Sequence, residues 1–220
     1  MKIMLHFLVA GLTTLLGVEP RRVVLPSEMA PFVPSGWQAI AWAGGDLNGD
    51  GRYDFALAMD DLSFIKPQDF YEKSPYLESP ARVLVIYLGG SKGYVPFGRY
   101  QCLPYDYYFS GMTIAQGLLR IKTMCCGFEG FFQSKEEYKY RFEQDRFRLI
   151  GADMHYYSRI DDNHCSVNLL TSQVKFTERR TDKEGPDAVG LSWEVFLRPL
   201  VLYLEDVPLV CFYGLTIPER

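Results

Sequence analysis

Apolar and polar residues alternate over a long stretch in the second half of the chain. Tyr138, Tyr140 and Phe142 are separated by charged residues, and after a polar break at residues 144–145 the alternation resumes in Arg146–Leu149. A two-residue period is typical of a strand with one buried face, and a short polar break between two such runs indicates a turn. The pattern therefore predicts an antiparallel hairpin with an aromatic face and a charged face.

Strand-like segments recur on both sides of this hairpin. They are short, rich in β-branched and aromatic residues, and separated by turn residues; they span Trp37–Ala43, Phe55–Met59, Arg82–Leu88, Leu119–Thr123, Val167–Leu170, Val174–Glu178, Ser192–Leu204 and Leu209–Gly214. No stretch combines a sustained 3.6-residue apolar period with helix caps, so few helices are expected. The sequence predicts an all-β, or β-dominated, single domain built of antiparallel hairpins.

The first residues carry a different pattern, typical of a targeting segment. Lys2 precedes an almost unbroken apolar run, Ile3–Val18, which is short for a membrane span and ends in polar residues. We interpret residues 1–18 as a secretory signal peptide; an uncleaved anchor or a buried N-terminal helix is the alternative. Residues 19–36 hold four prolines and are expected to form an extended connector to a β-rich domain, residues 37–220.

Composition and charge exclude several classes of protein and of binding partner. The chain has 220 residues, of which 48% are hydrophobic and 23% charged, and these proportions exclude a disordered or fibrous protein. Its net charge is −4, so no basic excess exists to neutralise a nucleic-acid backbone, and nucleic acid is not an expected partner. No second apolar run reaches membrane length, so no integral membrane span is expected in the mature chain.

All five cysteines follow the predicted leader. They are Cys102, Cys125, Cys126, Cys165 and Cys211. In an oxidising compartment such a set is compatible with one or two disulfides and a leftover thiol. The alternative is a set of unpaired cysteines that pack as small apolar residues.

The most informative motif is a polar loop between the first two predicted strands. Asp46, Asn48, Asp50 and Asp54 occupy positions 1, 3, 5 and 9 of the loop, and the carbonyl of Arg52 occupies position 7. Calcium takes six to eight oxygen ligands, and this spacing directs alternate oxygens to one centre. The sequence predicts a calcium site at residues 46–54. The alternative is a turn rich in Asx residues that binds no metal.

The same stretch resembles a known family. Gly44–Met59, with its Asp-Leu-Asn-Gly-Asp-Gly core, is similar to the calcium loop of FG-GAP/VCBS-type repeats. Position 12, a glutamate in EF-hands, is Leu57 here, and the predicted flanks are strands, so the loop is no EF-hand. The order of leader, loop and later hairpins further resembles exported bacterial proteins that carry a single such loop. The resemblance implies an exported β-rich protein and no particular activity.

Two segments deserve testing as catalytic sites. Ser91 lies in a Gly-x-Ser-x-Gly motif after a predicted strand, but the residues that follow cannot form the helix of a nucleophile elbow. A glycine-rich hairpin turn is the favoured interpretation there. Asp161–Cys165 gathers oxygen, nitrogen and sulfur ligands in a segment expected to be a loop between strands. An envelope hydrolase that uses Ser91 or this cluster is the alternative function.

The favoured function is binding. Tyr105, Tyr107 and Tyr108 lie in an aromatic segment without strand periodicity, and tyrosines of this kind supply contact area at protein interfaces. Packing of this segment over the sheet is the competing explanation. We expect an exported, calcium-stabilised, non-enzymatic protein of the bacterial periplasm or exterior that binds another protein. One concrete version is an immunity protein that neutralises a toxin by direct contact.

Overall fold

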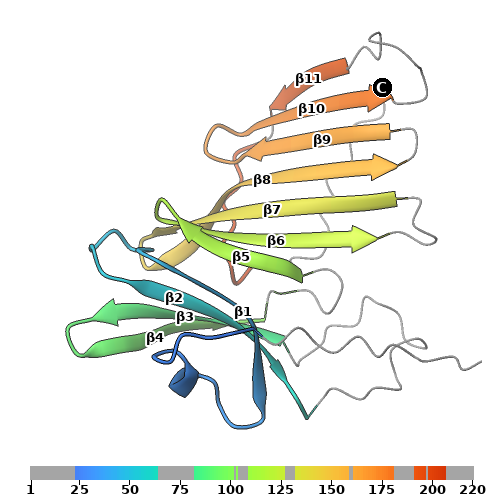
Figure 1. Cartoon of the computed structure of the whole chain (residues 1–220). Coiled ribbons are helices and arrows are strands. Elements are labelled where there is room, and N and C mark those ends of the chain that lie inside the picture. The colour runs from blue at the N-terminus through green and yellow to red at the C-terminus, as the bar shows by residue number, and fades with distance from the viewer. Residues whose placement is uncertain are drawn as a thin grey trace, which may run out of the picture.

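The computed structural model describes residues 23–63, 82–101, 103, 109–126, 132–158, 161–180, 191–196 and 198–206. These residues form two antiparallel sheets and one 3-10 turn, η1 (Ala30–Phe32) (Figure 1). The small sheet has the order β1-β2-β3-β4, and the large sheet has the order β11-β10-β9-β8-β7-β6-β5. Their bounds are β1 Trp37–Gly45, β2 Asp54–Asp61, β3 Arg82–Gly90, β4 Gly93–Tyr100, β5 Phe109–Ala115, β6 Leu118–Cys126, β7 Phe132–Glu143, β8 Arg146–Ser158, β9 Asp161–Asn168, β10 Gln173–Arg180 and β11 Leu191–Phe196. The predicted all-β class built of antiparallel hairpins is confirmed.

Hairpin turns occur where the sequence places them. β7 and β8 meet at Gln144 and Asp145, whose φ angles of 51° and 58° are left-handed, as a tight two-residue hairpin turn requires. β3 and β4 are joined through Ser91 and Lys92, because Gly90 pairs with Gly93. The glycine-rich turn predicted at Ser91 is therefore confirmed.

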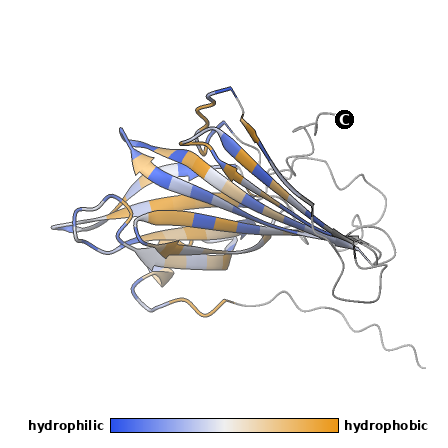
Figure 2. Cartoon of the chain, turned by 90° about the horizontal axis from the view of Figure 1, so that it is seen from above, coloured by the Kyte–Doolittle hydropathy of each residue, from blue (hydrophilic) through white to orange (hydrophobic). Residues whose placement is uncertain are grey.

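The large sheet has two chemically different faces, and Figure 2 shows hydrophilic and hydrophobic residues alternating along its strands. We call the face that carries Ile121, Tyr138, Leu149 and Val167 the inner face; these four side chains are buried. The opposite, outer face carries charged residues at the alternate positions, because successive side chains of a strand point to opposite sides.

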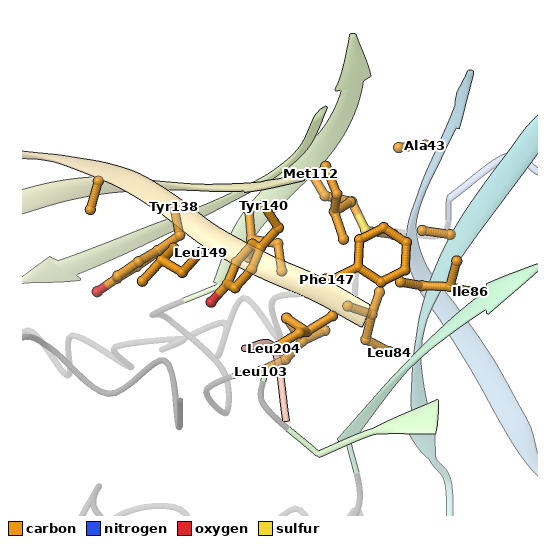
Figure 3. Packing of buried hydrophobic residues seen from close by; sticks show 14 of the residues in the cluster. Ala43, Leu84, Ile86, Leu103, Met112, Tyr138, Tyr140, Phe147, Leu149 and Leu204 are labelled. Carbon is orange, nitrogen blue, oxygen red and sulfur yellow. The ribbon is translucent and has the colours of Figure 1, made fainter. Parts of the chain in front are cut away.

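The main core lies where the inner face meets the small sheet. Figure 3 shows Phe147 of β8 among Leu84 and Ile86 of β3 and Met112 of β5, and all four side chains are buried. Leu204, which follows β11, is also fully buried in this cluster. One apolar cluster thus joins the two sheets into a single domain.

The other face of the small sheet holds a second core. Phe55, Val83 and Tyr87 point into it, and Met29 and Phe32 from the segment before β1 cover it. The prediction of a wholly extended connector is wrong here, since residues 30–32 form a 3-10 turn. Pro31 supports that turn because its fixed φ suits the start of a helical turn.

Two further expectations about strands need correction. Asp161–Cys165 is not a loop but the first part of β9, in register with β8 and β10. The strand expected over Ser192–Leu204 ends at Phe196; Pro199 follows, and Tyr203 then forms an isolated bridge with Arg148. The strand predicted at Leu209–Gly214 and the leader at residues 1–18 lie outside the described residues.

Candidate functional site

The predicted calcium loop connects β1 to β2 and is closed by the carboxylate of Asp46. Its Oδ1 accepts the N–H of Gly49 at 2.8 Å, and its Oδ2 accepts the N–H of Gly51 at 2.9 Å. Both glycines have left-handed backbone conformations, with φ of 77° and 79°, which residues with a Cβ rarely adopt. The glycines of the motif therefore allow the chain to curl around Asp46.

Asn48 and Asp50 continue the curl by local hydrogen bonds. Oδ1 of Asn48 accepts the N–H of Asp50 at 3.1 Å, and Oδ1 of Asp50 accepts the N–H of Arg52 at 2.9 Å. These are Asx turns, in which a short polar side chain caps the backbone two residues further on. The Arg52 guanidinium also lies 3.9 Å from Asp50, a long and exposed ion pair.

Asp54 has a different position, because it is fully buried at the start of β2. Its Oδ2 accepts the N–H of Leu47 at 2.7 Å, and its Oδ1 accepts the N–H of Gly89 in β3 at 2.7 Å. A Cβ at Gly89 would lie 2.4 Å from the carbonyl oxygen of Tyr53, so only glycine permits this approach. Asp54 thus ties the loop to the neighbouring strand.

The donor chemistry of this loop fits a hard cation. Asp46, Asn48 and Asp50 offer carboxylate and amide oxygens within five residues, and each oxygen that accepts one N–H keeps a second lone pair. No group of three or more acidic, histidine or cysteine side chains is placed to hold a metal ion anywhere in the described ranges. In the folded loop the side-chain oxygens of Asp46, Asn48 and Asp50 accept backbone N–H groups of the loop itself.

The second predicted cluster, Asp161–Cys165, is split by the strand it forms. His164 is exposed on the outer face, whereas Cys165 is buried on the inner face and is a free thiol. Burial, with a smaller contribution from the Asp153 carboxylate, raises the pKa of the Cys165 thiol to about 11. A nucleophilic cysteine needs a lowered pKa, so this environment opposes thiolate chemistry.

A polar group that the sequence analysis missed lies on the outer face across β7, β8 and β9. Asp153 accepts hydrogen bonds from Lys139 and, at 2.7 Å, from Ser166. Burial raises the pKa of Asp153, but these hydrogen bonds together with the charges of Lys139 and His164 outweigh it, so the pKa lies below its ordinary value. Next to it, His155 lies opposite His164 in the register and contacts Asp162.

These residues line a shallow hollow of about 390 Å³ on the outer face. Its lining includes Lys122, Lys135, Glu137, Asp153, His155 and His164. Basic and acidic side chains are mixed within it, and its ion pairs include Lys122 with Glu137 at 3.5 Å. The only available signal was strand alternation, since all six residues occupy outward positions on neighbouring strands. Without the register between strands, that signal does not bring them together.

The predicted partner-binding residues Tyr105, Tyr107 and Tyr108 lie outside the described residues. Of the surrounding segment, Tyr100 ends β4 and Phe109 begins β5. In the parts of the chain that are described, no helix has the length and apolar character needed to cross a bilayer.

Comparisons with known proteins give no relative. No protein-family model, no curated protein and no solved structure matches this chain. The similarity to FG-GAP/VCBS-type loops therefore stands on the residues of the loop itself.

Proposed function

We propose that this chain is an exported, non-enzymatic binding protein of the bacterial periplasm or exterior, stabilised by calcium at residues 46–54. The observation that carries the proposal is the closure of the loop. Asp46 organises its curl, and Asp54 links it to β3 through a 2.7 Å hydrogen bond from Gly89. An ion bound by Asp46, Asn48, Asp50, Asp54 and the Arg52 carbonyl would strengthen the connection among β1, β2 and β3.

The surroundings of the two catalytic candidates support a binding role. Ser91 is exposed in the β3–β4 turn, and β4 begins two residues later, where a nucleophile elbow requires a helix. Cys165 is buried with a raised pKa, on the opposite face from His164. Neither arrangement provides an activated nucleophile beside a base.

Within this function we favour an immunity protein that binds and neutralises a toxin. A small, acidic, single-domain β scaffold suits such a role, because one rigid surface is sufficient to block a partner. Tyr105, Tyr107 and Tyr108 are the proposed contact residues.

Thermal unfolding with and without calcium tests the ion site. Extracellular modules bind calcium with Kd values on the order of 10⁻⁴–10⁻³ M. At roughly 10 mM calcium, linkage then adds about 1.4–2.7 kcal/mol of stability, which raises the Tm by about 3–10 °C for a chain of this size. Superimposable melting curves in calcium and in chelator would reject the site.

Two substitutions at Asp50 separate ion binding from turn formation. Asp50→Asn keeps the acceptor for the Arg52 N–H but removes a charge, whereas Asp50→Ala removes both. We expect both variants to lose most of the calcium-dependent shift, and only the alanine variant to melt lower in chelator. Glu178→Gln, an exposed change on β10, is the matched control and should keep the full shift.

The partner site is tested with the tyrosines. Once the partner is identified by capture from the native host, Tyr105→Ala and Tyr107→Ala should each weaken binding by about 2 kcal/mol, or roughly thirtyfold, with little change in Tm. If both tyrosines belong to the core, each change should instead destabilise the fold by about 3–5 kcal/mol. That second result would reject the interface at this segment and leave the calcium result unaffected.

A further inference from the structure

Two histidines lie opposite each other on the outer face of the large sheet. His155 of β8 pairs with His164 of β9 in the register, and the centroids of their rings are 6.1 Å apart. Facing residues of an antiparallel pair hold their Cβ atoms about 4.5–5.5 Å apart, which is within reach of one shared ligand. The two side chains are 46% and 49% exposed, so an ion from solution can reach both rings.

Each histidine has a carboxylate beside its Nε2 atom. Nε2 of His155 contacts Asp162, and Nε2 of His164 lies 3.9 Å from Asp153. An ionised carboxylate only accepts hydrogen bonds, so the contact with Asp162 holds the proton of a neutral His155 on Nε2 and leaves the lone pair on Nδ1. Histidines that bind metals characteristically have a hydrogen-bond acceptor of this kind at the other ring nitrogen, where it orients the ring.

We propose that His155 and His164 together bind one divalent transition-metal ion, such as Cu²⁺ or Zn²⁺, for which imidazole is a suitable ligand. An ion shared by two imidazoles brings the ligating nitrogens to roughly 3 Å from each other, because each bond is about 2.0–2.1 Å long. Rotation of the two exposed side chains closes the remaining distance between the rings. Among the residues that the structure describes, no group of three metal-ligating side chains is placed to hold an ion, so water completes the coordination.

The charges around the pair favour this class of ion over calcium. Asp153 is already paired with Lys139, and Lys135 faces His155 in the register of β7 and β8. Two lysines thus offset the carboxylates of Asp153 and Asp162, and a hard cation that binds through charged oxygens gains little here. The affinity comes from the imidazole nitrogens. This inference does not depend on the proposed function.

Isothermal titration calorimetry of the full chain without a histidine tag, with Cu²⁺ and with Zn²⁺, tests the site. His155→Asn and His164→Asn should each weaken binding at least about tenfold. The double variant should lose little more than either single variant, because one imidazole without the other forms no chelate. The chain has a third histidine, His6 in the predicted leader, and His6→Asn is the matched control that should keep the affinity. Asp50→Asn in the calcium loop should also keep it.

Asp162→Asn tests the orienting carboxylate. The change should lower the metal affinity by roughly 10–100-fold, with little change of the Tm in chelator because both partners of the contact are solvent-accessible. Melting curves provide the second readout for the histidines. Saturating Zn²⁺ should raise the Tm of the wild type, and neither single histidine variant should show this rise.

Three results would overturn the proposal. The first is a wild-type chain that binds neither Cu²⁺ nor Zn²⁺. The second is a single histidine variant that keeps the full affinity, since one imidazole would then account for the binding. The third is binding that Asp50→Asn abolishes and the histidine variants keep, which would place the ion in the loop between β1 and β2. Circular dichroism checks that all variants fold, as the exposure of the substituted side chains leads us to expect.

Discussion

The small and the large sheet bury their strands in different ways. In the small sheet, seven successive residues of β2, from Asp54 to Asp60, are buried, because one face contacts the large sheet and Met29 and Phe32 cover the other. In the large sheet, burial alternates along β8, since the described residues cover only its inner face. The central strands of the small sheet are therefore doubly packed, and those of the large sheet are singly packed.

The difference determines where the polar residues can be. On the large sheet, most charged residues occupy the outer face in exposed or half-exposed ion pairs, and the buried Glu136 accepts hydrogen bonds from the hydroxyls of Thr123 and Tyr138. In the small sheet, a charge within β2 must be compensated inside the protein. Asp60 and Arg82 do this with two hydrogen bonds of 2.6 and 2.7 Å, and both residues are buried. The same kind of interaction therefore has different energetic weight in the two sheets.

The largest expected effect comes from removing an aromatic ring of the second core. Phe55 is fully buried and lies against Phe32, Tyr87 and Tyr94. Phe55→Ala should lower the free energy of unfolding by about 3–5 kcal/mol in a denaturant titration. Lys175→Ala on the outer face of the large sheet should change it by less than about 0.5 kcal/mol. Similar losses in both variants would break the comparison between the sheets.

A smaller effect is expected at the buried ion pair. Asp60→Asn keeps the shape of the side chain but removes the charge that compensates Arg82, so it should cost about 2–3 kcal/mol. The counterpart on the large sheet is Glu137→Gln, which removes two ion pairs, one with Lys122 and one with Arg120, and should cost less than about 1 kcal/mol. Chemical denaturation of both variants measures the two changes in the free energy of unfolding. An equal cost would mean that burial does not set the strength of these pairs.

Much of the large sheet could be predicted from the sequence, because its alternation reports burial directly. Tyr138 and Tyr140 are buried where the pattern places them, and the β7–β8 turn lies at the predicted break. The two-sided burial of β2 was not predictable from its own residues. It depends on Met29 and Phe32, which lie in a proline-rich segment without strand periodicity.

The candidate site likewise has one part that local sequence predicts and one part that depends on distant residues. The loop at residues 46–54 could be located because its signal is local: glycines and Asx residues at fixed spacing form the turns that they favour. The sequence predicts a loop at Asp161–Cys165 because its Asx residues disfavour strands on their own. They form β9 since β8 and β10 pair with it on both sides, and His155 contacts Asp162 across the β8–β9 pair. Such long-range pairing leaves no local trace.

The smallest expected effect is the pH dependence that Asp153 gives to the large sheet. Burial raises the pKa of Asp153, but hydrogen bonds from Lys139 and Ser166, together with the charges of Lys139 and His164, hold it below its ordinary value of 3.8. A carboxyl whose pKa is lowered by folding adds stability above that ordinary value and loses this contribution as the pH falls through the lowered one. In melting experiments from neutral pH to about pH 2, Asp153→Asn should therefore be less stable than the wild type near neutrality, and the two curves should converge in acid.

Asp145→Asn is the control. It removes a carboxylate at the exposed β7–β8 turn, where asparagine also tolerates the left-handed backbone, and its melting curves should follow those of the wild type throughout. A constant gap between Asp153→Asn and the wild type at all pH values would mean that Asp153 stabilises the outer face by shape alone.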